Sequence, residues 1–213
     1  MQPSFPSSSA QSVLGIDTTG PTLRLGLSNF ADVNRNQSWE LGRDLSMYLH
    51  QSLATFMPPC GWPDLAWIVV AKGPGGYTGT RLGVVTARTL AQQLNLPLYG
   101  VSTLAMFAWV YITGEHCQPD VPLAVDMPGQ KGHVHGGIYQ LMADQTLEVR
   151  SCDRHLTHSE WDVALAQQNI EHRLSLPTAV LSDRSLSQAL LTLGQQQQVK
   201  GYSAWDSVLP HYR

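Results

Sequence analysis

The chain has 213 residues and a mass of 23.4 kDa, which is enough for one large domain or two smaller lobes. Charged residues make up only 14% and the net charge is −3, so the chain has no basic surface with which to bind nucleic acid alone. No apolar run reaches the ~20 residues of a membrane span, the N-terminus lacks the features of a secretory signal, and the cysteines are few and scattered. These features indicate a soluble, cytoplasmic protein without a disulfide framework or a CxxC zinc site.

The chain is predicted to begin with a disordered leader and an antiparallel hairpin. Residues 1–11 are rich in serine and proline and poor in core material. A short apolar strand over 13–17 ends in Asp17, and after a turn leucines alternate with other residues over 23–27, as in a half-buried strand. A third strand is expected within 33–41. Asp17 is therefore expected at the tip of the hairpin.

The remainder of the first half alternates strands and helices. The expected elements are a helix over 44–57, a buried strand over 65–71, a glycine-dense turn over 72–80, a helix over 81–95, a strand over 98–101 and a helix over 102–114. The helix over 81–95 carries two largely uncharged faces. A helix that lies on a sheet needs only one. The second face is expected to contact another chain or lobe, and the alternative is a helix buried inside its own domain.

The second half opens like the first. Leu123-Ala124-Val125-Asp126 repeats the pattern of strand followed by aspartate about half a chain length after Asp17, which suggests two related lobes unless the short match is due to chance. The further elements expected are strands over 134–141 and 147–152, a helix over 157–169 behind a capping box, a strand over 178–181 and a helix over 185–193.

The glycine-dense turn, Gly73 to Thr80, follows a buried strand and precedes a helix. Such a turn can present backbone N–H groups at a helix N-terminus to an anion. Alternatively, its glycines serve only tight chain reversal and close packing. The turn lacks the Gly-Lys-Ser/Thr of a Walker A loop and the glycine spacing of a dinucleotide fingerprint.

Three motifs together resemble the TsaB (YeaZ) family of bacterial tRNA-modification proteins. They are Leu14 to Thr19, Gly73 to Gly83 and Leu96 to Leu104, and the similarity covers about residues 13–126. The resemblance implies an α/β, two-lobed actin/Hsp70-like (ASKHA, RNase H-like) fold with mixed sheets flanked by helices. The lobes implied are an N-terminal lobe over 12–104 and a smaller, divergent C-terminal lobe over 105–213, whose last residues can return to the first lobe.

The resemblance also implies a role without catalysis. The family helps to form N6-threonylcarbamoyladenosine next to the anticodon of ANN-decoding tRNAs. A TsaB-like subunit pairs with and stabilises a TsaD-like transferase, a TsaE-like ATPase docks on the pair, tRNA is contacted indirectly, and the subunit forms a homodimer when alone. By this analogy the partner interface lies on the helices over 44–57 and 81–95, at Leu45, Tyr48, Leu49, Arg81, Leu82, Val85 and Thr89.

The same resemblance identifies degenerate phosphate-loop positions, namely Asp17, Thr18, Thr19, Gly73, Gly75 and Gly79. A kinase of this superfold has a glycine where Thr18 stands, so no tightly bound nucleotide and no cofactor are expected. No two histidines are four residues apart, so the His-x-x-x-His pair of a metal-bearing relative is absent. Asp17 and Asp126 are either relics of a phosphate–Mg²⁺ site or caps of neighbouring turns.

His133 and His135 lie on one side of a predicted strand, where they either bind zinc with Asp126 or Cys117 or form a pair of surface histidines.

Two alternatives to the family role remain. The chain as a whole could instead be a stand-alone enzyme of the superfold, either a small-molecule kinase or a degenerate metallopeptidase, which ATP turnover would reveal. It could also be a homodimeric binding module, which would fail to capture a transferase partner.

Overall fold

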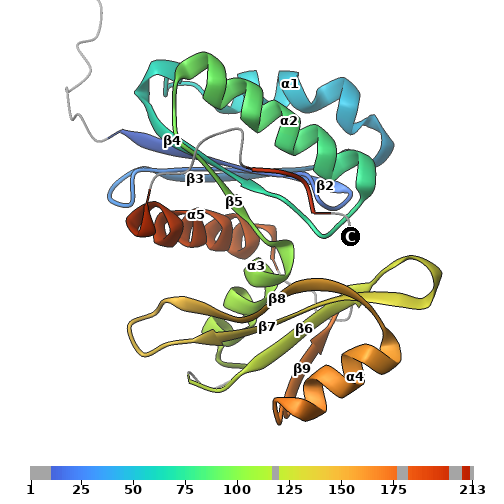
Figure 1. Cartoon of the computed structure of the whole chain (residues 1–213). Helices are drawn as coiled ribbons and strands as arrows, with labels where there is room; N and C mark the ends of the chain where they lie inside the picture. Colours follow the sequence, from blue (N-terminus) through green and yellow to red (C-terminus); the bar gives the residue numbers. More distant parts are fainter. Residues whose placement is uncertain (1–10, 117–119, 177–181, 202–207, 212–213) are drawn as a thin grey trace, which may run out of the picture.

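A computed structural model of the chain describes residues 11–116, 120–176, 182–201 and 208–211. The predicted disordered leader, apart from residue 11, and the strand predicted over 178–181 lie outside the described residues. Cys117, Tyr212 and Arg213 also lie outside them. The described chain forms two mixed sheets, each flanked by helices (Figure 1).

The first sheet has five strands in the order β3-β2-β1-β4-β5. Its strands are β1 (Ser12–Asp17), β2 (Thr22–Ser28), β3 (Asn34–Glu40), β4 (Leu65–Ala71) and β5 (Leu98–Val101). The first three are antiparallel neighbours, whereas β4 pairs in parallel with both β1 and β5. The polar strand β3 lies at the edge of the sheet, and the fully buried β1 lies at its centre.

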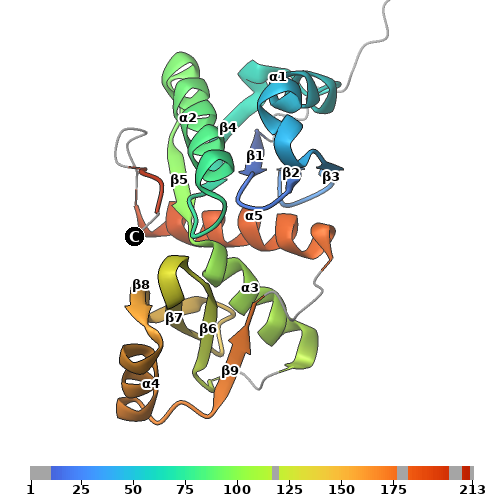
Figure 2. The ribbon, with the colours of Figure 1, turned by 90° about the vertical axis from the view of Figure 1, so that its right-hand side faces the viewer.

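Helices cover both faces of this sheet. Helices α1 (Leu45–Phe56) and α2 (Tyr77–Leu94) lie on one face, and α5 (Asp183–Lys200) lies on the other (Figures 1 and 2). Leu14 and Ile16 point to the α1–α2 side, while a Cβ added at Gly15 would lie 3.3 Å from Leu191 of α5. Apolar burial on both faces explains the nearly continuous apolar sequences of β1 and β4.

The second sheet has four strands in the order β8-β7-β6-β9. Its strands are β6 (Leu123–Pro128), β7 (His133–Leu141), β8 (Leu147–Thr157) and β9 (His172–Ser175). Helix α4 (His158–Gln167) packs on it through the buried Trp161. Helix α3 (Thr103–Tyr111), capped by the Ser102 side chain, packs against β6 and β7 on the side of the first sheet. Short helical turns lie at Gly42–Asp44, Trp62–Asp64, Ile112–His116 and Gln130–Gly132.

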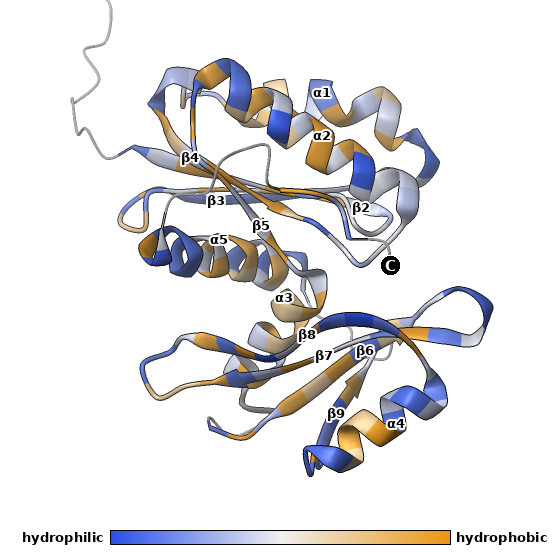
Figure 3. Cartoon of the chain, in the orientation of Figure 1, coloured by the Kyte–Doolittle hydropathy of each residue, from blue (hydrophilic) through white to orange (hydrophobic). Residues whose placement is uncertain are grey.

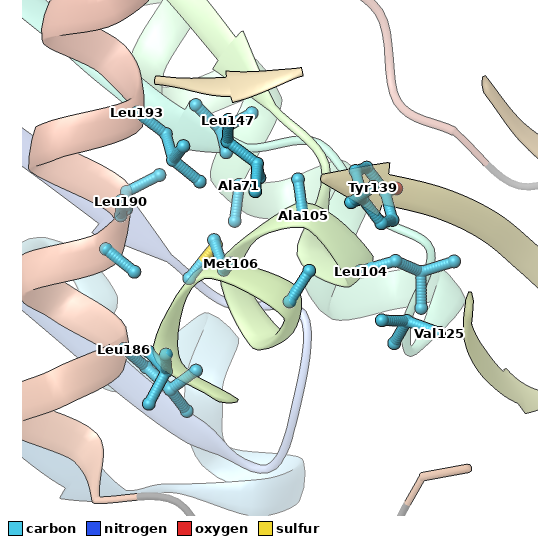
Figure 4. Close-up of a cluster of buried hydrophobic side chains, with 14 of the residues drawn as sticks. Ala71, Leu104, Ala105, Met106, Val125, Tyr139, Leu147, Leu186, Leu190 and Leu193 are labelled. Atoms are coloured by element: carbon cyan, nitrogen blue, oxygen red, sulfur yellow. The ribbon is translucent and has the colours of Figure 1, made fainter. Parts of the chain in front are cut away.

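A shared apolar core joins the two sheets through α3 and α5. Leu104, Ala105 and Met106 of α3 lie with Leu186, Leu190 and Leu193 of α5, between Ala71 of the first sheet and Val125 and Tyr139 of the second (Figure 4). Helix α3 is apolar around its circumference and buries most of its residues, which suits a helix that packs between the two sheets. Figure 3 shows orange apolar segments in strands and helices of both sheets, and blue hydrophilic segments in the outer loops.

The predicted α/β architecture of mixed sheets flanked by helices is confirmed. Some predicted bounds were wrong: β8 runs to Thr157 rather than Cys152, α5 extends over 183–200 rather than 185–193, and β9 was not predicted. The division into lobes over 12–104 and 105–213 stays a prediction. Residues 12–101 supply the first sheet and α1 and α2, but α5 covers the second face of that sheet.

Candidate functional site

The glycine turn packs directly against the turn between β1 and β2. The Thr18 Oγ1 donates to the Gly79 carbonyl at 2.8 Å, and the Gly76 N–H donates to the Thr19 carbonyl at 2.7 Å. A Cβ added at Gly75 or Gly79 would lie 2.4 Å or 2.3 Å from the Thr19 or Thr18 carbonyl oxygen. Close packing therefore accounts for these two glycines, while Gly73 adopts a positive φ of 99° that favours glycine.

Asp17 is buried at the end of β1, and both of its carboxylate oxygens have donors from the same lobe. Oδ1 accepts from the Thr19 N–H at 2.9 Å and the Thr19 hydroxyl at 2.7 Å, and Oδ2 accepts from Arg24 Nη1 at 3.1 Å. Arg24 is also paired with Asp183 of α5, at 2.6 Å. Asp17 thus caps the β1–β2 turn and links it to α5 through Arg24.

Asp126 is the fourth residue of β6 in the second sheet, two residues before the strand ends at Pro128. Its Oδ2 accepts from Trp161 Nε1 at 3.1 Å, Arg173 Nε at 2.7 Å and the Ser175 hydroxyl at 3.3 Å. The side chain is therefore held between α4 and β9. Of the two sequence-based interpretations of the paired aspartates, these contacts favour a structural role in each lobe.

A cleft of about 1170 Å³ lies between the lobes. Thr19, Gly75, Gly76 and Tyr77 line it from the first sheet and the turn before α2, and residues 127–131 line it from the end of β6 and the turn that follows. Among the predicted phosphate-loop positions, Thr19 and Gly75 line this cleft, whereas Asp17, Thr18, Gly73 and Gly79 do not. A role of this set in cofactor binding stays a prediction.

Four histidines line the same cleft, although the sequence had suggested only a pair. His133 and His155 stack with ring centroids 4.6 Å apart, and His135 lies 4.9 Å from His155 and 6.4 Å from His211. Within the described part of the chain, no three histidine, cysteine or carboxylate side chains are placed to hold a metal ion. Asp126, proposed as a further zinc ligand, is bound to Arg173 instead.

The pKa of His135 is lowered to about 4 by burial and by the neighbouring His155 and His211. Because this pKa lies below the ordinary value of about 6.5, the fold favours the neutral ring. The contribution of His135 to stability is fully present above about pH 6.5 and is lost as the pH falls toward 4. We therefore expect the loss of stability between pH 7 and 5, measured by urea unfolding, to be smaller in His135→Gln than in the native chain. An unchanged pH dependence in His135→Gln, equal to that of the exposed-site control His50→Gln, would contradict this assignment.

The interface positions predicted on α1 and α2 divide into a buried and an exposed set. Leu45 and Leu49 lie in the core beneath the helices and are not available to a partner in this structure. Tyr48, Arg81, Val85 and Thr89 are exposed, and Leu82 is half-buried. Two exposed apolar residues that the sequence analysis did not name, Met47 and Tyr77, extend the same surface.

The exposed positions on α2 lie along one side of the helix. Tyr77, Arg81, Val85 and Thr89 follow each other at four-residue intervals along α2, so they share one helical face. We call Met47, Tyr48, Tyr77, Arg81, Leu82, Val85 and Thr89 the α1–α2 face. A groove of about 590 Å³ at the start of the two helices borders it, lined by residues that include Arg43, Tyr77 and Leu82. Because Val85 and Thr89 are exposed, α2 is not a helix buried within its own domain.

Comparisons with known proteins relate this chain to proteins of one tRNA modification. A family model described as TsaD, tRNA N6-adenosine threonylcarbamoyltransferase, matches residues 57–195. The tRNA threonylcarbamoyladenosine biosynthesis protein TsaB of Bacillus subtilis is 31% identical over 176 residues, which cover 75% of each chain. The chain belongs to the TsaB family. TsaB of Escherichia coli is 31% identical over a shorter stretch of 99 residues, 45% of this chain and 42% of that protein.

Solved structures of TsaB relatives show the same fold. YeaZ from Pseudomonas aeruginosa superimposes with a TM-score of 0.74 at 18% identity, covering 95% of this chain and 100% of that one. A second Pseudomonas aeruginosa structure, described as similar to peptidase YEAZ, gives a TM-score of 0.75 at 18% identity over the same shares of each chain. The chain is thus a TsaB-family protein of tRNA threonylcarbamoyladenosine biosynthesis with the YeaZ fold. None of its described helices has the length and apolar character to cross a membrane.

Proposed function

We propose that this TsaB-family chain is a non-catalytic subunit that pairs with a TsaD-like transferase through the α1–α2 face and stabilises its active form. The product of the complex is N6-threonylcarbamoyladenosine next to the anticodon of ANN-decoding tRNAs. A TsaE-like ATPase docks on the pair, and the chain forms a homodimer through the same face when the partner is absent. The complex works in the cytoplasm.

The observation that carries this proposal is the apolar character of the α1–α2 face. Val85 is 50% exposed, Tyr48 42% and Met47 69%, although both helices already bury an apolar stripe against the sheet. Exposed apolar side chains gathered on two neighbouring helices are typical of a protein–protein contact surface. Tyrosine and methionine are also enriched where such surfaces are buried.

The absence of a catalytic role is supported by the state of the two lobe aspartates. Asp17 and Asp126 already accept hydrogen bonds from several donors of their own lobes, so neither carboxylate is available as a metal ligand in this structure. The sequence has no pair of histidines at four-residue spacing. At a net charge of −3, tRNA contact is expected to come mainly from the partner.

The test is size-exclusion chromatography with light scattering of the full chain, alone and mixed with the TsaD-like subunit of the same organism. We expect a one-to-one heterodimer, and we expect Val85→Glu to weaken it by about 100-fold or more, because an unpaired charge buried in an interface costs about 3 kcal/mol. Val163→Glu is the matched control, since Val163 is 55% exposed on α4 of the other lobe.

The native chain and Val163→Glu should behave alike in this experiment. A native chain that stays monomeric or homodimeric in the presence of the transferase would contradict the proposed pairing. Equal weakening by both substitutions would instead exclude the α1–α2 face as the interface. ATP turnover by the isolated chain would favour the stand-alone enzyme.

A further inference from the structure

Basic and acidic residues are unevenly distributed over the molecule. The layer formed by the turn Gly42–Asp44 and by α1 and α2 contains three arginines, Arg43, Arg81 and Arg88, no lysine and a single carboxylate, that of Asp44. The whole chain has 13 lysines and arginines and 16 aspartates and glutamates, so the rest of the molecule carries the excess of acid. The side proposed to bind a partner is thus the basic side of an acidic protein.

Many of the exposed carboxylates lie at the other end of the molecule. Figures 1 and 2 show α1 and α2 at one end and the second sheet with α4 at the other. On and around that sheet the exposed carboxylates include Asp144, Glu148, Glu160, Asp162 and Glu171. Because the two signs of charge are separated in this way, the electrostatic field of the chain favours the approach of an acidic surface to the α1–α2 side.

Arg43 and Arg81 lie where the starts of α1 and α2 meet. A Cβ added at Gly79 would lie 3.4 Å from Leu45 Cδ2, so the first turns of the two helices are in contact. Arg43 precedes α1 and lines the groove of about 590 Å³ together with Leu82, the residue after Arg81 in α2. None of the described residues that line this groove is an aspartate or glutamate. Both arginines therefore border the same end of the α1–α2 face.

The guanidinium groups of Arg43 and Arg81 are not paired with any carboxylate in the described part of the chain. Both residues are exposed, and no described aspartate or glutamate forms an ion pair with either. By contrast, Arg24 and Arg173 are each held by two carboxylates. A guanidinium group offers a planar fork of donors that matches a carboxylate. Arg43 and Arg81 are therefore available to carboxylates of another molecule.

The composition of this surface favours an acidic protein over RNA. Arginine, tyrosine and methionine are enriched in protein–protein interfaces and lysine is depleted, and the α1–α2 face with Arg43 follows this pattern. We propose that Arg43 and Arg81 pair with carboxylates of the transferase-like partner, and that they select this acidic surface over a second copy of the chain. The inference rests on the proposed pairing through the α1–α2 face and adds the chemistry of the surface that the face binds.

The same two arginines oppose a homodimer. In a two-fold symmetric dimer the same patch of both subunits meets, so the arginines of one copy approach those of the other. Salt screens this repulsion as well as the attraction to an acidic partner, because the screening length falls from about 10 Å at 0.1 M to about 3 Å at 1 M ionic strength. Added salt is therefore expected to weaken the heterodimer and to strengthen the homodimer.

Isothermal titration of the full chain with the TsaD-like subunit of the same organism, in about 0.1 M and about 1 M NaCl, tests the proposal. We expect the Kd of the heterodimer to rise about tenfold at the higher salt concentration. Arg43→Gln/Arg81→Gln should bind about tenfold more weakly at the lower salt concentration and lose most of the salt dependence. Arg154→Gln/Arg184→Gln is the matched control, because it removes two exposed arginines of β8 and α5 and gives the same net charge. The control should keep the salt dependence of the native chain.

Sedimentation equilibrium of the chain alone, at the same two salt concentrations, tests the selection against a second copy. We expect the homodimer to be about tenfold tighter at the higher salt concentration, and Arg43→Gln/Arg81→Gln to remove this difference. A homodimer that is tighter at the lower salt concentration would overturn the proposed selection, because the arginines would then meet the acidic end of a second copy.

The outcomes distinguish this inference from the pairing on which it rests. Absence of a heterodimer at both salt concentrations would refute the pairing and the inference together. A heterodimer whose Kd does not respond to salt, or responds equally in the two double variants, would overturn the inference and leave the pairing intact. Binding of tRNA to the chain alone, measured by fluorescence anisotropy and abolished in Arg43→Gln/Arg81→Gln, would assign the arginines to RNA instead.

Discussion

Gly75→Ala should lower the free energy of unfolding by about 2 kcal/mol, because the glycine turn has no room for a methyl group there. The new Cβ would lie 2.4 Å from the Thr19 carbonyl oxygen and 2.8 Å from the Thr19 Cβ. That oxygen accepts the Gly76 N–H, and Thr19 is itself held by Asp17, so neither can move without losing hydrogen bonds. For a chain of this size the expected fall in melting temperature is about 4–8 °C by calorimetry.

The adjacent glycine provides the control. A Cβ at Gly76 would meet only the Thr19 carbonyl oxygen, at an ordinary contact distance of 3.6 Å. Gly76→Ala is therefore expected to cost less than about 1 kcal/mol, as is usual for such a change at a helix N-cap. If the two variants melted at the same temperature, close packing would not be the reason for the glycine at position 75.

The strands and helices of the first sheet could be predicted because their patterns are local. Alternating leucines in β2, the apolar run of β4 and the proline pair after α1 each carry their signal within a few residues. Strand β9 carries no such pattern: it has four residues and two of them are exposed. Its place in the sheet depends on pairing with β6, where Arg173 contacts Asp126.

The end of α5 could not be read from the sequence, because glutamines dominate it. Gln196 hydrogen-bonds the backbone of Gln145 and Leu147 in the second lobe, and Gln197 donates to the Gly100 carbonyl at 3.1 Å in the first. These contacts join residues that are far apart in the sequence. These two glutamines therefore hydrogen-bond α5 to both halves of the molecule, a role that composition alone does not reveal.

The candidate interface and the cleft also depend on tertiary packing that the sequence does not reveal. Leu45 and Leu49 were placed in the same predicted interface as Val85 and Thr89, because helical spacing does not say which face of a helix the sheet covers. The structure buries the leucine pair and exposes the other. The cleft lined by four histidines depends on the pairing of β7 with β8 and on a segment more than 50 residues further along, so only two of its histidines could be associated in advance.

Asp126→Ala is expected to lower the free energy of unfolding by about 3 kcal/mol, because it leaves buried donors without an acceptor. Asp126 is 4% exposed and Trp161, whose Nε1 donates to it, is 1% exposed. The substitution also removes the carboxylate that holds Arg173 of β9 at 2.7 Å. Urea unfolding followed by tryptophan fluorescence measures the loss directly.

Asp162→Ala is the control, because it removes an exposed carboxylate that pairs with the same arginine, Arg173, without removing a buried hydrogen-bond acceptor. The Asp162 side chain is 68% exposed and lies 3.6 Å from Arg173 Nη1, so its removal is expected to cost no more than about 0.5 kcal/mol. Both variants lose one carboxylate beside Arg173, but only Asp126→Ala leaves the indole N–H unpaired. If the two losses were equally small, the hydrogen bonds of Asp126 would not stabilise the second sheet, and a ligand-binding role for this carboxylate would become the better explanation of its buried position in β6.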